Sequence, residues 1–149
     1  MRRRTISAFL CAAVVMVGAP AIGAVTVNSA STYEWQIVVE TNAQRVSHGK
    51  VATRGSGCAK DYAIKRARWM RDHRKLKHSD LSTVMRACHF TRAAENIAMG
   101  YPNGEAVVRA WMNSSGHRAN ILNSKYTRLG TGARRDSRGV WWSVEIFGR

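Results

Sequence analysis

Residues 107–122 read VVRAWMNSSGHRANIL, and they predict a helix that ends just before a histidine. Apolar residues recur at helical spacing from Gly104 to Asn113, and Asn103 stands where an N-cap is expected. Small residues follow, and we expect Gly116 to end the helix in the left-handed C-cap conformation. The chain would then turn His117 away from the face of that helix, which makes His117 a candidate functional side chain.

Two more helices are predicted nearer the N-terminus. From Cys58 to about Lys75, alanines at positions 59, 63 and 67 form an apolar stripe with basic residues off it. Small residues on that stripe predict a close approach to another element. A first helix is expected at Trp35–Val46, after a loose Ser/Thr/Asn-rich segment over residues 25–34.

The C-terminal part changes to the alternating period of strands. Thr127–Arg134 and Val140–Phe147 are predicted strands, joined by a hairpin through RDSRG at residues 135–139. In the second strand, Val140, Trp142, Val144 and Ile146 share one face, and Trp141, Ser143, Glu145 and Phe147 share the other. Helices on both sides of the sheet would shield both faces from water.

The first 24 residues have the pattern of a signal peptide. Arg2–Arg4 form a basic start, Ile6–Val17 form an apolar run, and small residues follow to Ala24. The run is shorter than the roughly 20 residues that span a membrane. We therefore expect residues 1–24 to be removed, and the mature chain to be secreted without a transmembrane segment.

Cleavage would leave two of the three cysteines. Cys11 lies in the predicted signal peptide, so Cys58 and Cys88 remain in an oxidising compartment. A disulfide between them is the favoured interpretation, closing a loop of 88 − 58 = 30 residues and contributing roughly 3–4 kcal/mol. Two buried thiols are the alternative.

The chain is strongly basic, with 24 Lys and Arg against 9 Asp and Glu and a formal net charge of +15. Such a charge favours anionic neighbours such as acidic lipid, cell-wall polymer or nucleic acid. The positive residues are scattered, which is typical of a solvated surface. No nucleic-acid motif is present, so any such binding is expected to be nonspecific and to weaken steeply with salt.

Four motifs occur in order along the chain: HSDL at 78–81, ENIAMGY at 95–101, the opening stretch, and GTGARR followed by GVWWSVEIFG at 130–148. Together they resemble the CAP superfamily (cysteine-rich secretory proteins, antigen 5 and pathogenesis-related proteins) in its bacterial secreted form, the SCP-like extracellular domains. The resemblance covers about 38–148. It implies one α+β domain over 35–149, a three-layer α-β-α sandwich with a small antiparallel sheet and ENIAM on or beside a strand.

The resemblance also implies a cleft lined by two histidines and two glutamates. His78 and His117 match the two histidines, and Glu95 matches the first glutamate. Ser114 stands where the second glutamate is expected, and Glu105 lies too early to replace it. The four-residue set is therefore incomplete, and chemistry that needs two carboxylates is not predicted.

Several functions remain open from the sequence. His78 and His117 can together hold a divalent cation such as zinc, although no cofactor is required; alternatively, Glu95 hydrogen-bonds one or both histidines in a purely structural role. We expect a secreted binding module of the cell envelope or cell wall, whose ligand is a lipid, a wall polymer or another anion. The alternative is a metal-assisted hydrolase with Glu95 as base.

Overall fold

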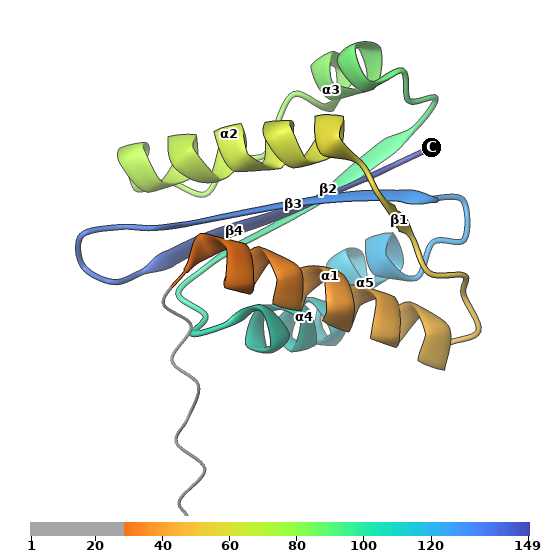
Figure 1. Cartoon of the computed structure of the whole chain (residues 1–149), viewed down its shortest axis with the longest axis horizontal. Helices are drawn as coiled ribbons and strands as arrows, with labels where there is room; N and C mark the ends of the chain where they lie inside the picture. The colour runs from red at the N-terminus through yellow and green to blue at the C-terminus, as the bar shows by residue number, and fades with distance from the viewer. Residues whose placement is uncertain (1–28) are drawn as a thin grey trace, which may run out of the picture.

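The computed structural model describes residues 29–149; the predicted signal peptide, with Cys11, lies outside them. Within this range the chain forms five helices and four strands (Figure 1). The helices are α1 Ala30–Ser47, α2 Gly57–His73, α3 Leu81–Cys88, α4 Gly104–Asn113 and α5 Ser115–Ile121. The strands are β1 Arg54–Gly55, β2 Ala93–Met99, β3 Arg128–Arg135 and β4 Trp141–Gly148.

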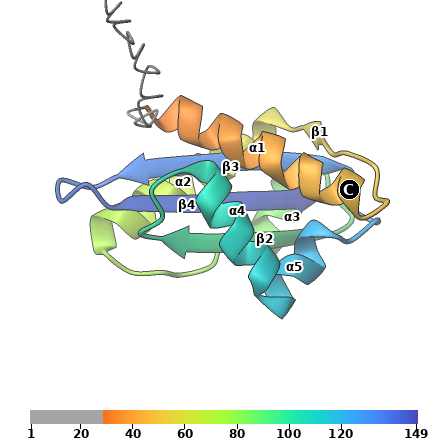
Figure 2. The ribbon, with the colours of Figure 1, turned by 90° about the horizontal axis from the view of Figure 1, so that it is seen from below.

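The strands form a single sheet between two helical layers, which confirms the predicted fold class. Their order is β1-β3-β4-β2; β3, β4 and β2 are antiparallel, and the two-residue β1 adds a parallel pair at the far edge. Helices α2 and α3 lie on one side, and α1, α4 and α5 lie across the other (Figures 1 and 2). Every residue of β4 is buried, because helices cover both of its faces.

The layer of α2 lies very close to the sheet, as its alanine stripe predicts. Ala59 and Ala63 are fully buried and face Gly130 and Gly132 of β3. A Cβ atom on either glycine would collide with the α2 backbone. The close approach therefore depends on alanine on the helix and glycine on the strand. Trp142, Val144 and Ile146 of β4 complete this half of the core.

The first helix begins earlier than predicted. Ser29 caps α1 by accepting a 3.1 Å hydrogen bond from the backbone N–H of Thr32, so residues 30–34 are helical and not part of a loose segment. Tyr33 and Ile37 are fully buried against the α4 side of the core. The predicted start at Trp35 is too late because Ser29, the N-cap, lies in a Ser/Thr/Asn-rich stretch whose composition is typical of a loose segment.

The predicted disulfide between Cys58 and Cys88 is present. It joins the start of α2 to the last residue of α3. Because α3 is only eight residues long, this covalent link and the N-cap of Asp80 hold its two ends.

The turn between α4 and α5 differs from the prediction. Ser114 ends α4 with an extended backbone at φ −102° and ψ 123°, and Gly116 lies inside α5 without a positive φ. The reorientation that separates His117 from the α4 face therefore occurs at Ser114. The predicted left-handed cap at Gly116 is therefore wrong.

Candidate functional site

The candidate site lies along the edge strand β2, where Glu95 meets the segment that precedes α3. Glu95 Oε1 accepts 2.8 Å hydrogen bonds from His78 Nδ1 and from the backbone N–H of Ser79. Glu95 Oε2 accepts a 2.5 Å hydrogen bond from the Ser79 hydroxyl. Hydrogen bonds to the Glu95 carboxylate thus connect the HSDL segment to the ENIAM strand.

The two partners differ sharply in exposure. The Glu95 side chain is 0% exposed, whereas the His78 side chain is 59% exposed. Three donors therefore surround a carboxylate that water cannot reach, as buried acceptors require. The His78 ring is held through Nδ1, and Nε2 makes no hydrogen bond to the described residues. Glu95 consequently orients His78 and anchors the 74–80 segment to the sheet.

His117 lies on α5 and does not join this hydrogen-bonded group directly. The pKa of His117 is lowered from its usual value, mainly because burial disfavours the charged ring and secondarily because of the positive charge that His78 can carry. The two rings are therefore near enough to influence one another. The imidazole of His117 is accordingly neutral at physiological pH.

A cavity of about 270 Å³, the β2 cleft, opens beside β2. Its lining residues are Leu76, Ile97, Ala98, Met99, Tyr101, Ala110, Trp111, Ser114 and His117. Trp111 Nε1 donates a 3.3 Å hydrogen bond to the Ile97 carbonyl, so the indole ring covers part of the outer edge of β2. Of the predicted site residues, Ser114 and His117 line this cleft, whereas His78 and Glu95 do not. Glu105 is exposed on α4 and pairs with Arg109 at 3.8 Å, so it does not supply a second carboxylate.

Behind the cleft lies a buried polar network that sequence reasoning missed. Glu145 of β4 accepts 2.8 Å hydrogen bonds from the Thr41 hydroxyl and from Asn96 Nδ2. Asn96 Nδ2 also donates to the His117 carbonyl at 3.1 Å, and Asn96 Oδ1 accepts from Asn120 at 2.8 Å. The network therefore fixes α5, which carries His117, to the middle of the sheet. The strand alternation placed Glu145 on a covered face, but it could not supply the partners.

Burial raises the pKa of Glu145 to about 7, against the opposing effects of its two hydrogen-bond donors and the charge of Arg45. Arg45 of α1 is itself buried, and burial lowers the pKa of its guanidinium. The guanidinium donates hydrogen bonds of 2.6–3.0 Å to four carbonyls, those of Val51, Ile121, Asn123 and Tyr126. One arginine thus ties the end of α1 to the connection between α5 and β3.

The described residues offer few ligands for the zinc ion that the sequence suggested. A closed structural zinc site has four protein ligands, and a catalytic one has three. Between residues 29 and 149, no three His, Cys, Asp or Glu side chains are grouped so that they could hold a metal ion. Since the oxygens of Glu95 are already engaged, His78 and His117 are the donors that remain. The described residues therefore do not fit a closed zinc site.

In the described part of the chain, no helix is both long enough and apolar enough to cross a membrane.

The model of the cysteine-rich secretory protein family (CAP) matches residues 38–146.

Several similar proteins come from bacteria. The chain is 34% identical to the uncharacterized protein YkwD of Bacillus subtilis over 82% of this chain and 49% of that protein. It is 37% identical to the uncharacterized membrane protein YlbC of the same organism over 70% of this chain and 32% of that protein. The chain thus spans about half or less of these relatives. A crystal structure of an extracellular protein containing an SCP domain from Bacillus anthracis superposes with a TM-score of 0.73 at 28% identity, covering 80% of this chain and 41% of that one. The family match over most of the chain, together with the shared sandwich, means that this protein belongs to the cysteine-rich secretory protein (CAP) family.

Proposed function

We propose that this CAP domain is an extracellular binding module that takes a small, mainly apolar ligand in the β2 cleft. Apolar side chains form most of the lining, and Ser114 and a neutral His117 provide polar groups. Ligand sites commonly combine an apolar lining with a few polar groups that fix orientation. A volume of about 270 Å³ suits a small lipid-like tail or a similar compact molecule.

The observation that carries this proposal is the state of Glu95. A general base must reach the proton it removes, directly or through one water. Glu95 is fully buried and its two oxygens already accept three hydrogen bonds from His78 and Ser79. Its role is therefore to position neighbouring residues. Because the Glu95 carboxylate is not free to remove a proton, its state favours a binding function over the metal-assisted hydrolysis that the sequence left open.

The extracellular location rests on two supports. The N-terminal 24 residues have the pattern of a signal peptide, and the Bacillus anthracis structure is that of an extracellular protein. Removal of residues 1–24, with their three arginines and no acidic residue, would leave a net charge of +15 − 3 = +12. This charge suits contact with acidic lipids or wall polymers, so we extend the proposal to the cell envelope.

A weak divalent-cation site is a second candidate. Metal-binding histidines commonly donate their other ring nitrogen to a carboxylate, and His78 donates Nδ1 to Glu95 in this way. His78 and His117 would then be the two protein ligands, with water at the other positions. Zinc calorimetry on the oxidised protein and on the His78→Ala/His117→Ala double variant tests this candidate. Micromolar binding that the double variant loses would support it, and equal binding by both proteins would contradict it.

The binding proposal is tested with 1-octanol, a neutral probe with a short alkyl chain. Ala110 lines the cleft, whereas Ala119 is exposed on α5 outside it. Ala110→Leu should fill the cleft and weaken octanol binding at least tenfold in calorimetry, and Ala119→Leu should change it less than twofold. Because the probe is uncharged, added salt should have little effect. Equal effects of the two leucines, or no saturable binding, would overturn the proposal.

A further inference from the structure

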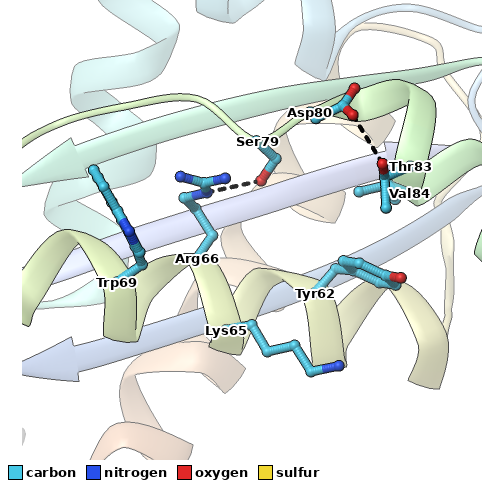
Figure 3. Close-up of a pocket in the computed structure, with 8 residues that line it drawn as sticks. All are labelled: Tyr62, Lys65, Arg66, Trp69, Ser79, Asp80, Thr83 and Val84. Atoms are coloured by element: carbon cyan, nitrogen blue, oxygen red, sulfur yellow. Dashed lines mark hydrogen bonds between the residues drawn. The ribbon is translucent and has the colours of Figure 1, made fainter.

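A second hollow lies on the opposite helical layer, between α2 and the segment that leads into α3 (Figure 3). We call it the α2–α3 recess; it has a volume of about 290 Å³ and is separate from the β2 cleft. Tyr62, Arg66 and Trp69 project into it from positions i, i+4 and i+7 of α2, which share one face of the helix. Ser79 and Asp80 bound it from the other side.

The recess carries positive charge that the protein does not neutralise. Lys65 and Arg66 line it, and Lys77 lies with Nζ 5.7 Å from the centre of the Trp69 ring. Across residues 29–149, no carboxylate comes within ion-pair distance of any of these three cations. Their other contacts are with the faces of Tyr62 and Trp69 and, for Arg66, with Ser79, so an anionic group of a ligand would meet cations that no carboxylate already pairs.

Arg66 is held in a fixed orientation. Its Nε donates a 3.1 Å hydrogen bond to the Ser79 hydroxyl, which in turn donates to Glu95. The two terminal nitrogens of the guanidinium make no hydrogen bond to the described residues. A guanidinium fixed through Nε presents a planar pair of donors that matches a carboxylate.

The aromatic residues and Asp80 add a different kind of contact. Tyr62 and Trp69 flank Arg66 (Figure 3). The Trp69 ring is already stacked on His73, with 4.2 Å between ring centres, and lies 5.3 Å from the Arg66 guanidinium. A ligand ring would therefore pack against Tyr62 while its charged group reaches the guanidinium. Asp80 accepts hydrogen bonds from Ser82 and Thr83, and these hold its pKa down to about 2. Asp80 is thus an ionised acceptor at the margin of a cationic recess, suited to hydroxyl groups. The combination matches a sugar ring that bears both hydroxyls and a carboxylate.

We propose that the α2–α3 recess binds an acidic saccharide, with the sugar carboxylate on the terminal nitrogens of Arg66 and the ring against Tyr62. A single-stranded nucleic acid is less well matched. Such strands need a groove that follows several successive nucleotides, whereas the recess is a single hollow of about 290 Å³. The proposal goes beyond the β2 cleft, since it concerns other residues and a ligand of other chemistry.

The test uses linear trigalacturonate, its methyl ester as the uncharged control, and calorimetry on the oxidised protein. Arg66→Gln and Arg68→Gln remove the same charge from the same helix, but Arg68 is exposed and lies outside the recess. We expect Arg66→Gln to weaken trigalacturonate binding at least tenfold and Arg68→Gln less than twofold. The methyl ester should bind at least tenfold more weakly than the acid.

Lys65→Gln provides a variant that cannot disturb the core, because Lys65 is exposed and makes no hydrogen bond to the described residues. It should weaken binding several-fold while leaving the melting temperature unchanged. Equal losses in the Arg66 and Arg68 variants would mean attraction by overall charge, and would overturn the proposal. Tighter binding of a thymidine tetranucleotide that depends on Arg66 would assign the recess to nucleic acid instead. Absence of saturable trigalacturonate binding would also overturn it. Octanol binding in the β2 cleft should be the same in all these variants. A failed proposal for the recess is therefore distinguishable from a failed proposal for the β2 cleft.

Discussion

Asn96 of β2 and Glu145 of β4 stand directly opposite one another in the sheet and are joined by a 2.8 Å hydrogen bond from Nδ2 to Oε1. The same amide holds the His117 carbonyl at 3.1 Å. The helix that carries a cleft histidine is therefore positioned, through the Asn96 amide, by a buried carboxylate of the adjacent sheet. This relationship makes the protonation of Glu145 relevant to the stability of the whole site.

Stability should fall as the pH rises through the titration of Glu145. Its pKa is raised from 4.5 to about 7 in the folded chain. The folded chain then holds this proton to higher pH than the unfolded chain, so unfolding releases it, and the free energy of unfolding falls between about pH 4.5 and 7. The full effect is on the order of 3 kcal/mol, at about 1.4 kcal/mol per pKa unit. Denaturant unfolding at a series of pH values measures it.

Glu145→Gln is the matched control for that titration. Glutamine resembles the protonated acid and can still accept from Asn96, so the variant should lose this part of the pH dependence and be at least as stable as the natural protein at pH 7.5. Parallel pH profiles for the two proteins would contradict a raised pKa for Glu145.

Arg45→Lys should be strongly destabilising although the charge is kept. The four carbonyls that Arg45 contacts need a planar, branched donor, and an ammonium group cannot reach them all. We expect the free energy of unfolding to fall by about 2–4 kcal/mol, since buried carbonyls lose their partners. Arg54→Lys, at an exposed position of β1, should change it by less than about 0.5 kcal/mol. Comparable losses in the two variants would show that the carbonyl contacts are unimportant.

Ser79→Ala should loosen the attachment of the 74–80 segment. It removes the hydroxyl that donates to Glu95 and accepts from Arg66. Leaving a buried carboxylate short of one donor should cost about 1–3 kcal/mol. Ser137→Ala, in the exposed β3–β4 hairpin, should be neutral within about 0.5 kcal/mol. Thermal unfolding of the two variants side by side measures the difference, and an unchanged melting temperature for Ser79→Ala would argue against the anchoring role.

The pKa of His117 should respond to residue 78. Burial and the charge of His78 both lower it from 6.5, with burial the larger cause. His78→Gln removes the second cause, so the His117 titration followed by NMR should move to higher pH but stay below 6.5. A titration that does not move would mean that the two rings are too far apart to share a cleft ligand.

The elements with strong local patterns were predictable, and the site was predictable only in part. The alanine stripe of α2, with its close approach to another element, and the alternation of β4 each follow from spacing. The start of α1 was missed because Ser29 is a cap that looks like a linker residue, and α3 was missed because eight residues give too short a pattern. The motifs indicated His78, Glu95, Ser114 and His117.

What the sequence could not supply were contacts between distant residues. Arg45 meets the carbonyl of Tyr126 across 81 positions, and Thr41 meets Glu145 across 104. Such pairs have no local periodicity, and a polar residue on a helix is ordinarily read as exposed. The recess between α2 and α3 was hidden for the same reason, because Arg66 and Lys65 were read as part of a solvated basic face.

The central claim, that the β2 cleft is a site for a small apolar ligand, is tested most directly by methyl NMR of methionine-labelled protein titrated with 1-octanol. Met99 lines the cleft and is 41% exposed, whereas Met70 of α2 is fully buried in the other half of the core. The account predicts a saturable shift of the Met99 methyl signal, no shift of Met70, and loss of the Met99 response in Ala110→Leu. An unmoved Met99 signal at saturating octanol, or an equal response in Ala110→Leu, would contradict it.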